Sequence, residues 1–186
     1  MGNKAYLAIF DLDGTLFDTS EVNYLAYRDA AAKYGFTLRR EDFLRRFVGR
    51  NYREFLPELG VAAEALEPIH REKKRLYPEH LKHSRANRQL LRLVGSLRGD
   101  WQTALVTTAS RRNTMDILGA FGVAELFDLI IAQEDVARLK PDPECYLTAM
   151  ERAGVGAADT LIFEDSDAGI AAASGTGAAV VRVERF

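Results

Sequence analysis

The chain has 186 residues, of which 47% are hydrophobic and 28% are charged, and its formal net charge is −2 at pH 7. That length allows one well-packed core and a small second unit, and the composition is typical of a globular protein rather than a disordered one. The longest apolar runs are only as long as a strand, and no charged and apolar leader precedes the first of them. Because the chain also lacks a basic stripe, we expect a cytoplasmic enzyme that binds neither nucleic acid nor membrane.

The first predicted element is a strand, Tyr6–Phe10, that ends in acids. Its uninterrupted apolar side chains are typical of a parallel strand that is covered on both faces. Ligands of parallel sheets lie beyond the carboxyl ends of the strands, so Asp11 and Asp13 are expected to reach one crevice beside the flexible Gly14. Two carboxylates at this spacing can hold a hard cation, for which Mg²⁺ is the natural candidate. On its own, the pattern is equally that of a strand followed by an ordinary Asp-Gly turn.

A helical segment is predicted next. Thr19 or Ser20 can cap a helix that reaches about residue 34, and further helices are predicted at 41–48, 52–59 and 62–81. Residues 19–82 hold 13 Lys or Arg against 10 Asp or Glu, whereas the rest of the chain holds 12 against 17. A basic segment above an acidic cation site would attract an anionic substrate. We therefore expect residues 18–85 to form a helical domain of their own.

Strands and helices alternate through the rest of the chain. Helices are predicted at 86–97, at 111–121 after a capping Ser110, and at 143–153, and strands at 103–106, 129–132, 160–163 and 178–183. Strands separated by helices indicate a parallel sheet with right-handed connections. The expected fold is therefore α/β, with a discontinuous core of residues 1–17 and 86–186 around the helical insertion.

The histidines and the cysteine suggest no separate site. His70, His80 and His83 have a poor spacing for zinc and are expected to be solvated or partly packed. A single cysteine cannot form an internal disulfide, and Cys145 lies in a helical pattern. A buried structural thiol is the favoured interpretation.

Four motifs occur in a fixed order along the chain. They are D-L-D-G-T-L-F-D-T from Asp11, A-L-V-T-T ending at Thr108, K-P-D-P from Lys140, and L-I-F-E-D-S ending at Ser166 and continuing into G-I. Together they resemble the motifs of the haloacid dehalogenase-like (HAD) superfamily of phosphotransferring hydrolases. The helical block between the first two motifs resembles the small cap of the subgroup that includes phosphoglycolate phosphatase and β-phosphoglucomutase. The resemblance implies a Rossmann-like core with an inserted helical cap.

The resemblance also implies roles for the acids. Asp11 would attack phosphorus to form an aspartyl-phosphate, and Asp13 would act as general acid and base while its backbone carbonyl joins the magnesium shell. Asp165 would be the third magnesium ligand, with Glu164 either alongside it or behind it. Some members carry another acid where this chain has Gly169, so Glu164 could substitute for that acid. The role of Asp167 stays open.

The resemblance also implies three residues that bind the phosphoryl group and one residue that contacts the rest of the substrate. Thr107 would donate its hydroxyl, Thr108 its backbone N–H, and Lys140 its ammonium. Pro141 and Pro143, which follow Lys140, restrict its loop and prevent it from forming a helix. Arg50 follows Gly49 in what resembles the cap loop that approaches the active site, which makes it a candidate substrate contact.

Three functions fit these motifs. The leading one is a magnesium-dependent phosphatase that acts on a small phosphorylated metabolite. A sugar phosphomutase of the β-phosphoglucomutase type shares every core motif, but this chain has Asn23 and Val48 where the mutase pattern has histidine and lysine. A silent binding protein on the same fold is expected to have lost Asp11 or Asp13, and both are present. The sequence does not specify the substrate or the oligomeric state.

Overall fold

The structure is a computed structural model that describes residues 4–184 and residue 186. The chain divides into two compact units, one formed by Met1–Asp18 and Ala86–Phe186 and the other by Thr19–Arg85. A two-stranded sheet of β2 (Phe17–Asp18) and β3 (Arg85–Ala86) lies where the chain passes from the first unit to the second and back. Within the described residues, no helix is both long and apolar enough to cross a membrane.

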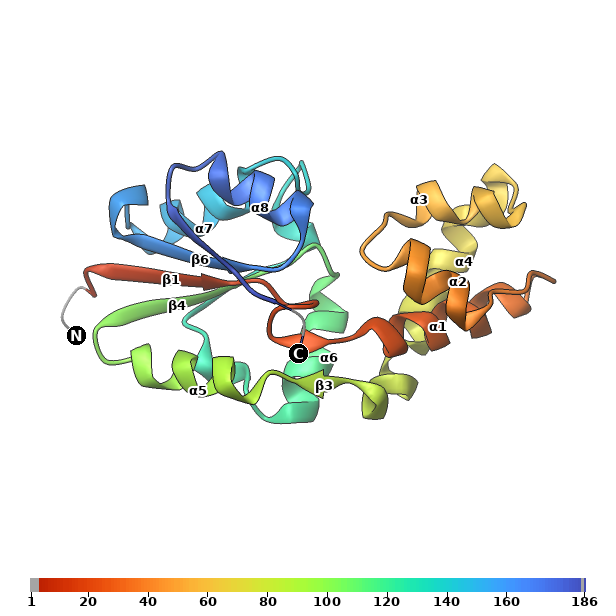
Figure 1. Ribbon diagram of the computed structural model, residues 1–186, viewed down its shortest axis with the longest axis horizontal. Coiled ribbons are helices and arrows are strands. Elements are labelled where there is room, and N and C mark those ends of the chain that lie inside the picture. Colours follow the sequence, from red (N-terminus) through yellow and green to blue (C-terminus); the bar gives the residue numbers. More distant parts are fainter. Residues whose placement is uncertain (1–3, 185) are drawn as a thin grey trace. The chain divides into compact units, whose positions relative to one another are not determined.

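The first unit is built on a five-stranded parallel sheet (Figure 1). Its strand order is β5-β4-β1-β6-β7. The bounds are β1 Tyr6–Phe10, β4 Trp101–Val106, β5 Leu129–Ile131, β6 Thr160–Glu164 and β7 Ala179–Arg182. The interiors of the central strands are buried because both faces of the sheet are covered. The predicted α/β class and parallel sheet are confirmed.

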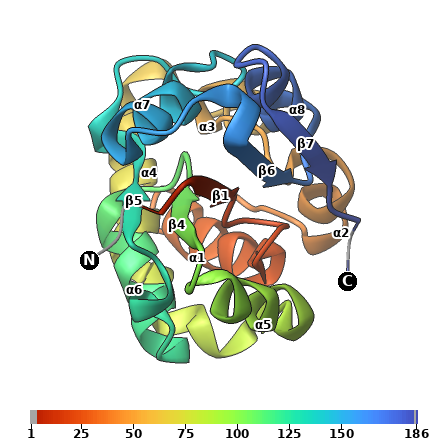
Figure 2. The same cartoon turned by 90° about the vertical axis from the view of Figure 1, so that its left-hand side faces the viewer.

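Four helices cover this sheet, two on each face (Figure 2). Helices α7 (Glu144–Ala153) and α8 (Asp167–Ser174) lie on one face, and α5 (Arg88–Leu97) and α6 (Arg111–Phe121) on the other. Short 3₁₀ turns at Ala124–Leu126, Gln133–Asp135 and Ala157–Asp159 lie in the connections. Ser110 caps α6 as predicted, since its hydroxyl accepts the Asn113 N–H, and the predicted burial of Cys145 is confirmed at 2% exposure.

The second unit is helical, but its helices are shorter than predicted. Helix α1 spans Ser20–Ala32, and the other elements are α2 (Arg40–Asp42), a π-helical turn (Phe43–Phe47), α3 (Tyr52–Phe55), a 3₁₀ turn (Pro57–Leu59), α4 (Ala63–Leu76) and a 3₁₀ segment (Tyr77–His83). The predictions of single α-helices at 41–48, 52–59 and 62–81 were therefore wrong in extent. Pro57 and Pro78 have no N–H to donate to the fourth preceding carbonyl, and a tighter turn follows where α3 and α4 end before them. Helix α4 nevertheless continues through Pro68.

Aromatic rings form the core of the helical unit. Tyr27 meets Phe55 edge-on with ring centroids 5.0 Å apart, and the His70 ring stacks on Tyr52 at 3.8 Å. The Tyr27 hydroxyl and His70 Nδ1 are 2.8 Å apart, so this histidine is a partly packed core residue, as predicted. Lys73 is also buried, with its ammonium 4.7 Å from the centroid of the Tyr77 ring, where an aromatic face replaces part of the lost hydration.

We expect His70 to make the stability of the protein depend on pH. Burial, together with the nearby Lys73 charge, lowers the pKa of His70 to about 3. The unfolded chain takes up this proton below about pH 6.5, whereas the folded protein does not, so stability should fall as the pH falls from about 6.5 toward 3. His70→Gln, which never becomes charged, should lose less thermal stability on acidification than the wild type. His83→Gln, at an exposed position, should follow the wild type. Identical pH profiles for His70→Gln and the wild type would disprove this assignment.

Candidate active site

The acids of the first and fourth motifs meet at one edge of the sheet. Phe10 lies opposite Leu105 of β4 on one side and Phe163 of β6 on the other, so the residues that follow these three come out side by side. The Asp11 N–H donates to the Phe163 carbonyl at 3.0 Å, which fixes the first acid beside the end of β6. Asp11 therefore lies next to Glu164 because β1 and β6 pair in register up to Phe10 and Phe163.

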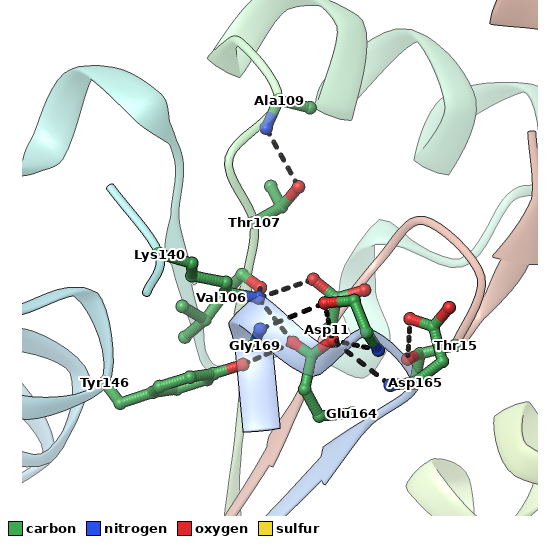
Figure 3. A network of polar contacts seen from close by, with 11 residues as sticks. Asp11, Thr15, Val106, Thr107, Ala109, Lys140, Tyr146, Glu164, Asp165 and Gly169 are labelled. Atoms are coloured by element: carbon green, nitrogen blue, oxygen red, sulfur yellow. Dashed lines mark hydrogen bonds and ion pairs between the residues drawn. The ribbon is translucent and has the colours of Figure 1, made fainter. Parts of the chain in front are cut away.

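Lys140 reaches into this edge and bridges two carboxylates (Figure 3). Its Nζ lies 2.6 Å from Asp11 Oδ1 and 2.7 Å from Glu164 Oε2, and it donates at 3.4 Å to the carbonyl of Val106. Its side chain is 5% exposed, and the side chains of Asp11 and Glu164 are 9% and 1% exposed. All three donors of the ammonium are directed at oxygen atoms of the site, so the position of this cation is closely defined.

Glu164 is satisfied by five donors. Its Oε2 accepts from Lys140 and from the Tyr146 hydroxyl at 2.6 Å. Its Oε1 accepts from the N–H groups of Asp165 at 3.1 Å and Ser166 at 3.0 Å, and from the Ser166 hydroxyl at 2.9 Å. A buried carboxylate with this many partners is rigid, and its remaining capacity to bind a cation is small.

Asp165 is the more available acid. Its Oδ1 accepts a bond from the Thr15 hydroxyl at 3.2 Å, and its other oxygen lies against Gly14, where a Cβ would stand only 2.1 Å away. Gly14 also has a φ of +93°, and this backbone conformation by itself favours glycine. One oxygen each from Asp11, Glu164 and Asp165 lies within 4.8 Å of the others. Hard oxygen donors grouped in this way suit a divalent cation such as Mg²⁺.

The electrostatics of the site follow from its burial. Burial raises the pKa of Asp11, and the Lys140 ammonium opposes that shift. Burial likewise disfavours the charged form of Lys140, but Asp11, Tyr146 and Glu164 outweigh it and place the pKa of this lysine above its usual value. Burial, followed by the charge of Glu164, raises the pKa of Asp165 to about 6. Asp11 and Asp165 both have raised pKa values, and the single lysine of the site binds Asp11 and Glu164, so the site is short of positive charge, which a cation would supply.

The structure also places the other residues that the sequence predicted for the site, which are Asp13, Thr107, Thr108 and Arg50. Asp13 lies in the turn after Asp11, and Thr107 is buried directly after β4, where its hydroxyl accepts the Ala109 N–H at 3.0 Å (Figure 3). Thr108 is exposed. Arg50 belongs to the helical unit, where it pairs with Glu58 at 2.8 Å.

Two residues of the network were missed by the sequence analysis. Thr15 stands inside the first motif, and its hydroxyl could have been noticed beside a predicted metal ligand. Tyr146 lies on α7 with its side chain fully buried, and only the fold shows that its hydroxyl reaches Glu164. A tyrosine on the inward face of a helix is usually read as packing, so the sequence carries no signal for this contact.

Gly169 is expected to be essential because Glu164 occupies the space beside it. A Cβ at Gly169 would lie 2.0 Å from the Glu164 side-chain carboxyl carbon, which five donors hold in place. Gly169→Ala should therefore displace the carboxylate from Lys140, lower catalytic activity and cost about 1–3 kcal/mol of stability. Gly119→Ala is the matched control, since this helical glycine has nothing within 4 Å of its Cβ position and should gain about 0.5–1 kcal/mol. Equal effects of the two substitutions on unfolding and activity would contradict the close approach.

Comparison with known proteins gives the family. A profile described as haloacid dehalogenase-like hydrolase matches residues 8–183. The chain belongs to this family. It is 37% identical over 176 residues to a phosphorylated carbohydrates phosphatase of Thermotoga maritima, covering 91% of this chain and 80% of that protein. The resemblance stated from the four motifs is confirmed.

Two further relatives resemble this chain over most of its length. The β-phosphoglucomutase of Bacillus subtilis is 30% identical over 191 residues, covering 94% of this chain and 81% of that protein. The crystal structure of CbbY from Rhodobacter sphaeroides in complex with phosphate superposes with a TM-score of 0.85 at 26% identity, covering 98% of this chain and 87% of that chain. The likeness to CbbY confirms the haloacid dehalogenase-like fold.

Proposed function

We propose that the protein is a magnesium-dependent phosphatase that hydrolyses a small phosphorylated metabolite through an aspartyl-phosphate on Asp11. The observation that carries the proposal is the buried contact of 2.6 Å between Lys140 and the Asp11 carboxylate, beside a second acid, Asp165. A carboxylate held at the end of a strand by a buried ammonium is oriented for attack and is flanked by positive charge for the phosphoryl oxygens. Membership of a hydrolase family supports the reaction class.

The residues divide the chemistry between them. Asp11 attacks phosphorus, and Asp13 protonates the leaving oxygen and then activates the water that hydrolyses the phosphoenzyme. Lys140 and Thr107 bind the phosphoryl oxygens, with the Thr108 N–H beside them. Asp11, Asp165 and the Asp13 carbonyl would hold Mg²⁺, which would neutralise charge on the phosphoryl group when bound.

We assign Glu164 the role of binding Lys140, and we do not count it as a metal ligand. Its two oxygens already accept five hydrogen bonds. The Glu164 carboxylate also occupies the space that the Cβ of an acid at position 169 would need. Glu164 is therefore a second carboxylate, beside Asp11, that balances the charge of the lysine. The sequence left open whether Glu164 binds the metal alongside Asp165 or lies behind Asp165 without binding the metal, and we favour the second placement.

The proposed substrate is a phosphorylated sugar or another small metabolite. The Thermotoga relative is named for phosphorylated carbohydrates, and it matches over most of this chain. We assign the residue 18–85 segment as the cap, with Arg50 a candidate contact for the substrate, and we propose a cytoplasmic location, where such metabolites occur.

The second candidate is a sugar phosphomutase, which the relative from Bacillus subtilis supports. The mutase pattern has a histidine at the position of Asn23, whose side-chain amide here donates to the carbonyl and hydroxyl oxygens of Thr19, both at 3.1 Å. An asparagine cannot act as a proton-transferring imidazole. Supplying a hexose 1-phosphate with its bisphosphate activator separates the two functions, because isomer formation faster than phosphate release would favour the mutase.

The experiment that tests the phosphatase is a screen of purified protein against phosphorylated sugars and other small phosphate esters. We expect phosphate release that stops in excess chelator and returns with Mg²⁺, but does not return with Ca²⁺, which prefers more ligands and a looser geometry. Full activity in excess chelator, or no hydrolysis of any phosphate ester, would disprove the proposal.

A further inference from the structure

The fully buried hydroxyl of Tyr146 is a polar group for which the proposed chemistry has no use. The side chain is 0% exposed, and its hydroxyl donates to Glu164 Oε2 at 2.6 Å (Figure 3). Its ring lies against the site as well, with the Lys140 Nζ 4.9 Å from the ring centroid. The residue therefore contacts both members of the Lys140–Glu164 pair.

The oxygen that accepts from Tyr146 is the same one that accepts from Lys140. Lys140 lies almost equally far from its two carboxylates, 2.6 Å from Asp11 Oδ1 and 2.7 Å from Glu164 Oε2. A hydroxyl bonded to Glu164 Oε2 takes up part of the negative charge on that oxygen and so weakens its attraction for the ammonium. Asp11 Oδ1 accepts from Lys140, and within the described residues no neutral hydroxyl donates to it. The two carboxylate oxygens that bind the ammonium therefore differ in their other partners.

We propose that Tyr146 is a positioning residue for Lys140: by sharing Glu164 Oε2, its hydroxyl keeps the ammonium directed at Asp11 and the phosphoryl group. The inference rests on the proposed phosphatase function. It assigns no contact between Tyr146 and substrate. Without the hydroxyl, Glu164 would draw the ammonium toward itself, and the phosphoryl group would lose charge stabilisation as the transition state forms.

The test is Tyr146→Phe in the full-length protein, which keeps the buried ring and removes only the hydroxyl. We expect kcat to fall by about 10-fold, the usual loss for a partner that orients a catalytic group, with little change in KM. Inhibition by orthovanadate, which resembles the five-coordinate transition state, should weaken in parallel with kcat. Inhibition by inorganic phosphate should change much less. Cys145→Ala, the neighbouring buried residue on α7, is the packing control and should leave both inhibition constants unchanged.

A double-mutant cycle with Glu164→Gln distinguishes positioning from packing. If Tyr146 acts through Glu164, the Tyr146→Phe, Glu164→Gln double variant should have the kcat of Glu164→Gln alone. A kcat for Tyr146→Phe equal to that of the wild type, a parallel loss of vanadate and phosphate inhibition, or multiplicative effects in the double variant would each overturn the inference while the phosphatase assignment stands. A wild-type protein that hydrolyses no phosphate ester would overturn both.

Discussion

Asp11→Asn should abolish phosphatase activity, lowering kcat by about 10,000-fold or more, as loss of a covalent nucleophile does in other enzymes. The amide keeps the shape of the carboxylate but cannot attack phosphorus, and it is a poorer ligand for Mg²⁺. The variant should still fold, because Asn can accept a bond from Lys140 and because the backbone N–H of residue 11 remains bonded to Phe163. Steady-state kinetics and thermal unfolding of the same preparation measure both expectations.

Asp167→Asn is the matched control for that substitution. Asp167 is an acid of the same edge of the sheet, but its side chain is 91% exposed and pairs with Arg182. Surface pairs of this kind contribute little, so its replacement should change neither activity nor stability by a large factor. Near-normal activity in Asp11→Asn would show that another group attacks phosphorus, and the assignment of the nucleophile would have to be abandoned.

Lys140→Met is expected to have the second largest effect, on stability as well as on activity. The substitution leaves Asp11 and Glu164 buried without their shared cation, and breaking a buried pair from one side typically costs about 3–5 kcal/mol. Loss of the ammonium at the phosphoryl group should lower kcat by about 100-fold or more. The loss of stability should be larger at neutral pH than near about pH 5, because the two unpaired carboxyls can fold in the protonated form at low pH.

Lys4→Met is the control for removing a lysine from an ion pair. Lys4 pairs with Asp128 at 2.8 Å, and the two side chains are 26% and 34% exposed. Such a pair contributes up to about 1 kcal/mol. A free energy of unfolding for Lys140→Met that matches that of Lys4→Met would mean that the lysine is not the counter-ion of a buried site.

The acids were predictable from sequence because their positions follow from the strands, whereas Lys140 was predicted from the resemblance of its K-P-D-P motif to that of the family. Three apolar runs end in Asp11, Thr107 and Glu164, and a parallel sheet brings its carboxyl ends together whatever the connections are. The role of Glu164 could not be predicted in this way, because it depends on donors from α7, from the Lys140 loop and from the residues between β6 and α8, which converge only in the fold. The burial of Lys73 was missed for a similar reason: a lysine on a helix is expected in water until aromatic neighbours from other helices are known.

The helix ends of the second unit show that the spacing of apolar residues does not by itself predict where a helix ends. Apolar residues at helical spacing continue through Pro57 and Pro78, so the pattern extends each predicted helix past the residue that ends it. A proline removes one N–H and disfavours a further α-helical turn, but it does not decide the helix end alone, because α4 continues through Pro68.

The central claim is that the phosphoryl group passes through Asp11. The most direct measurement is a rapid acid quench during turnover of an aryl phosphate, whose good leaving group favours accumulation of the intermediate, followed by mass spectrometry of the peptides. The account predicts one phosphoryl group on the peptide that contains Asp11 in the wild type and none in Asp11→Asn. Turnover of the wild type with the phosphoryl group found on another residue, or on none at any quench time, would contradict it.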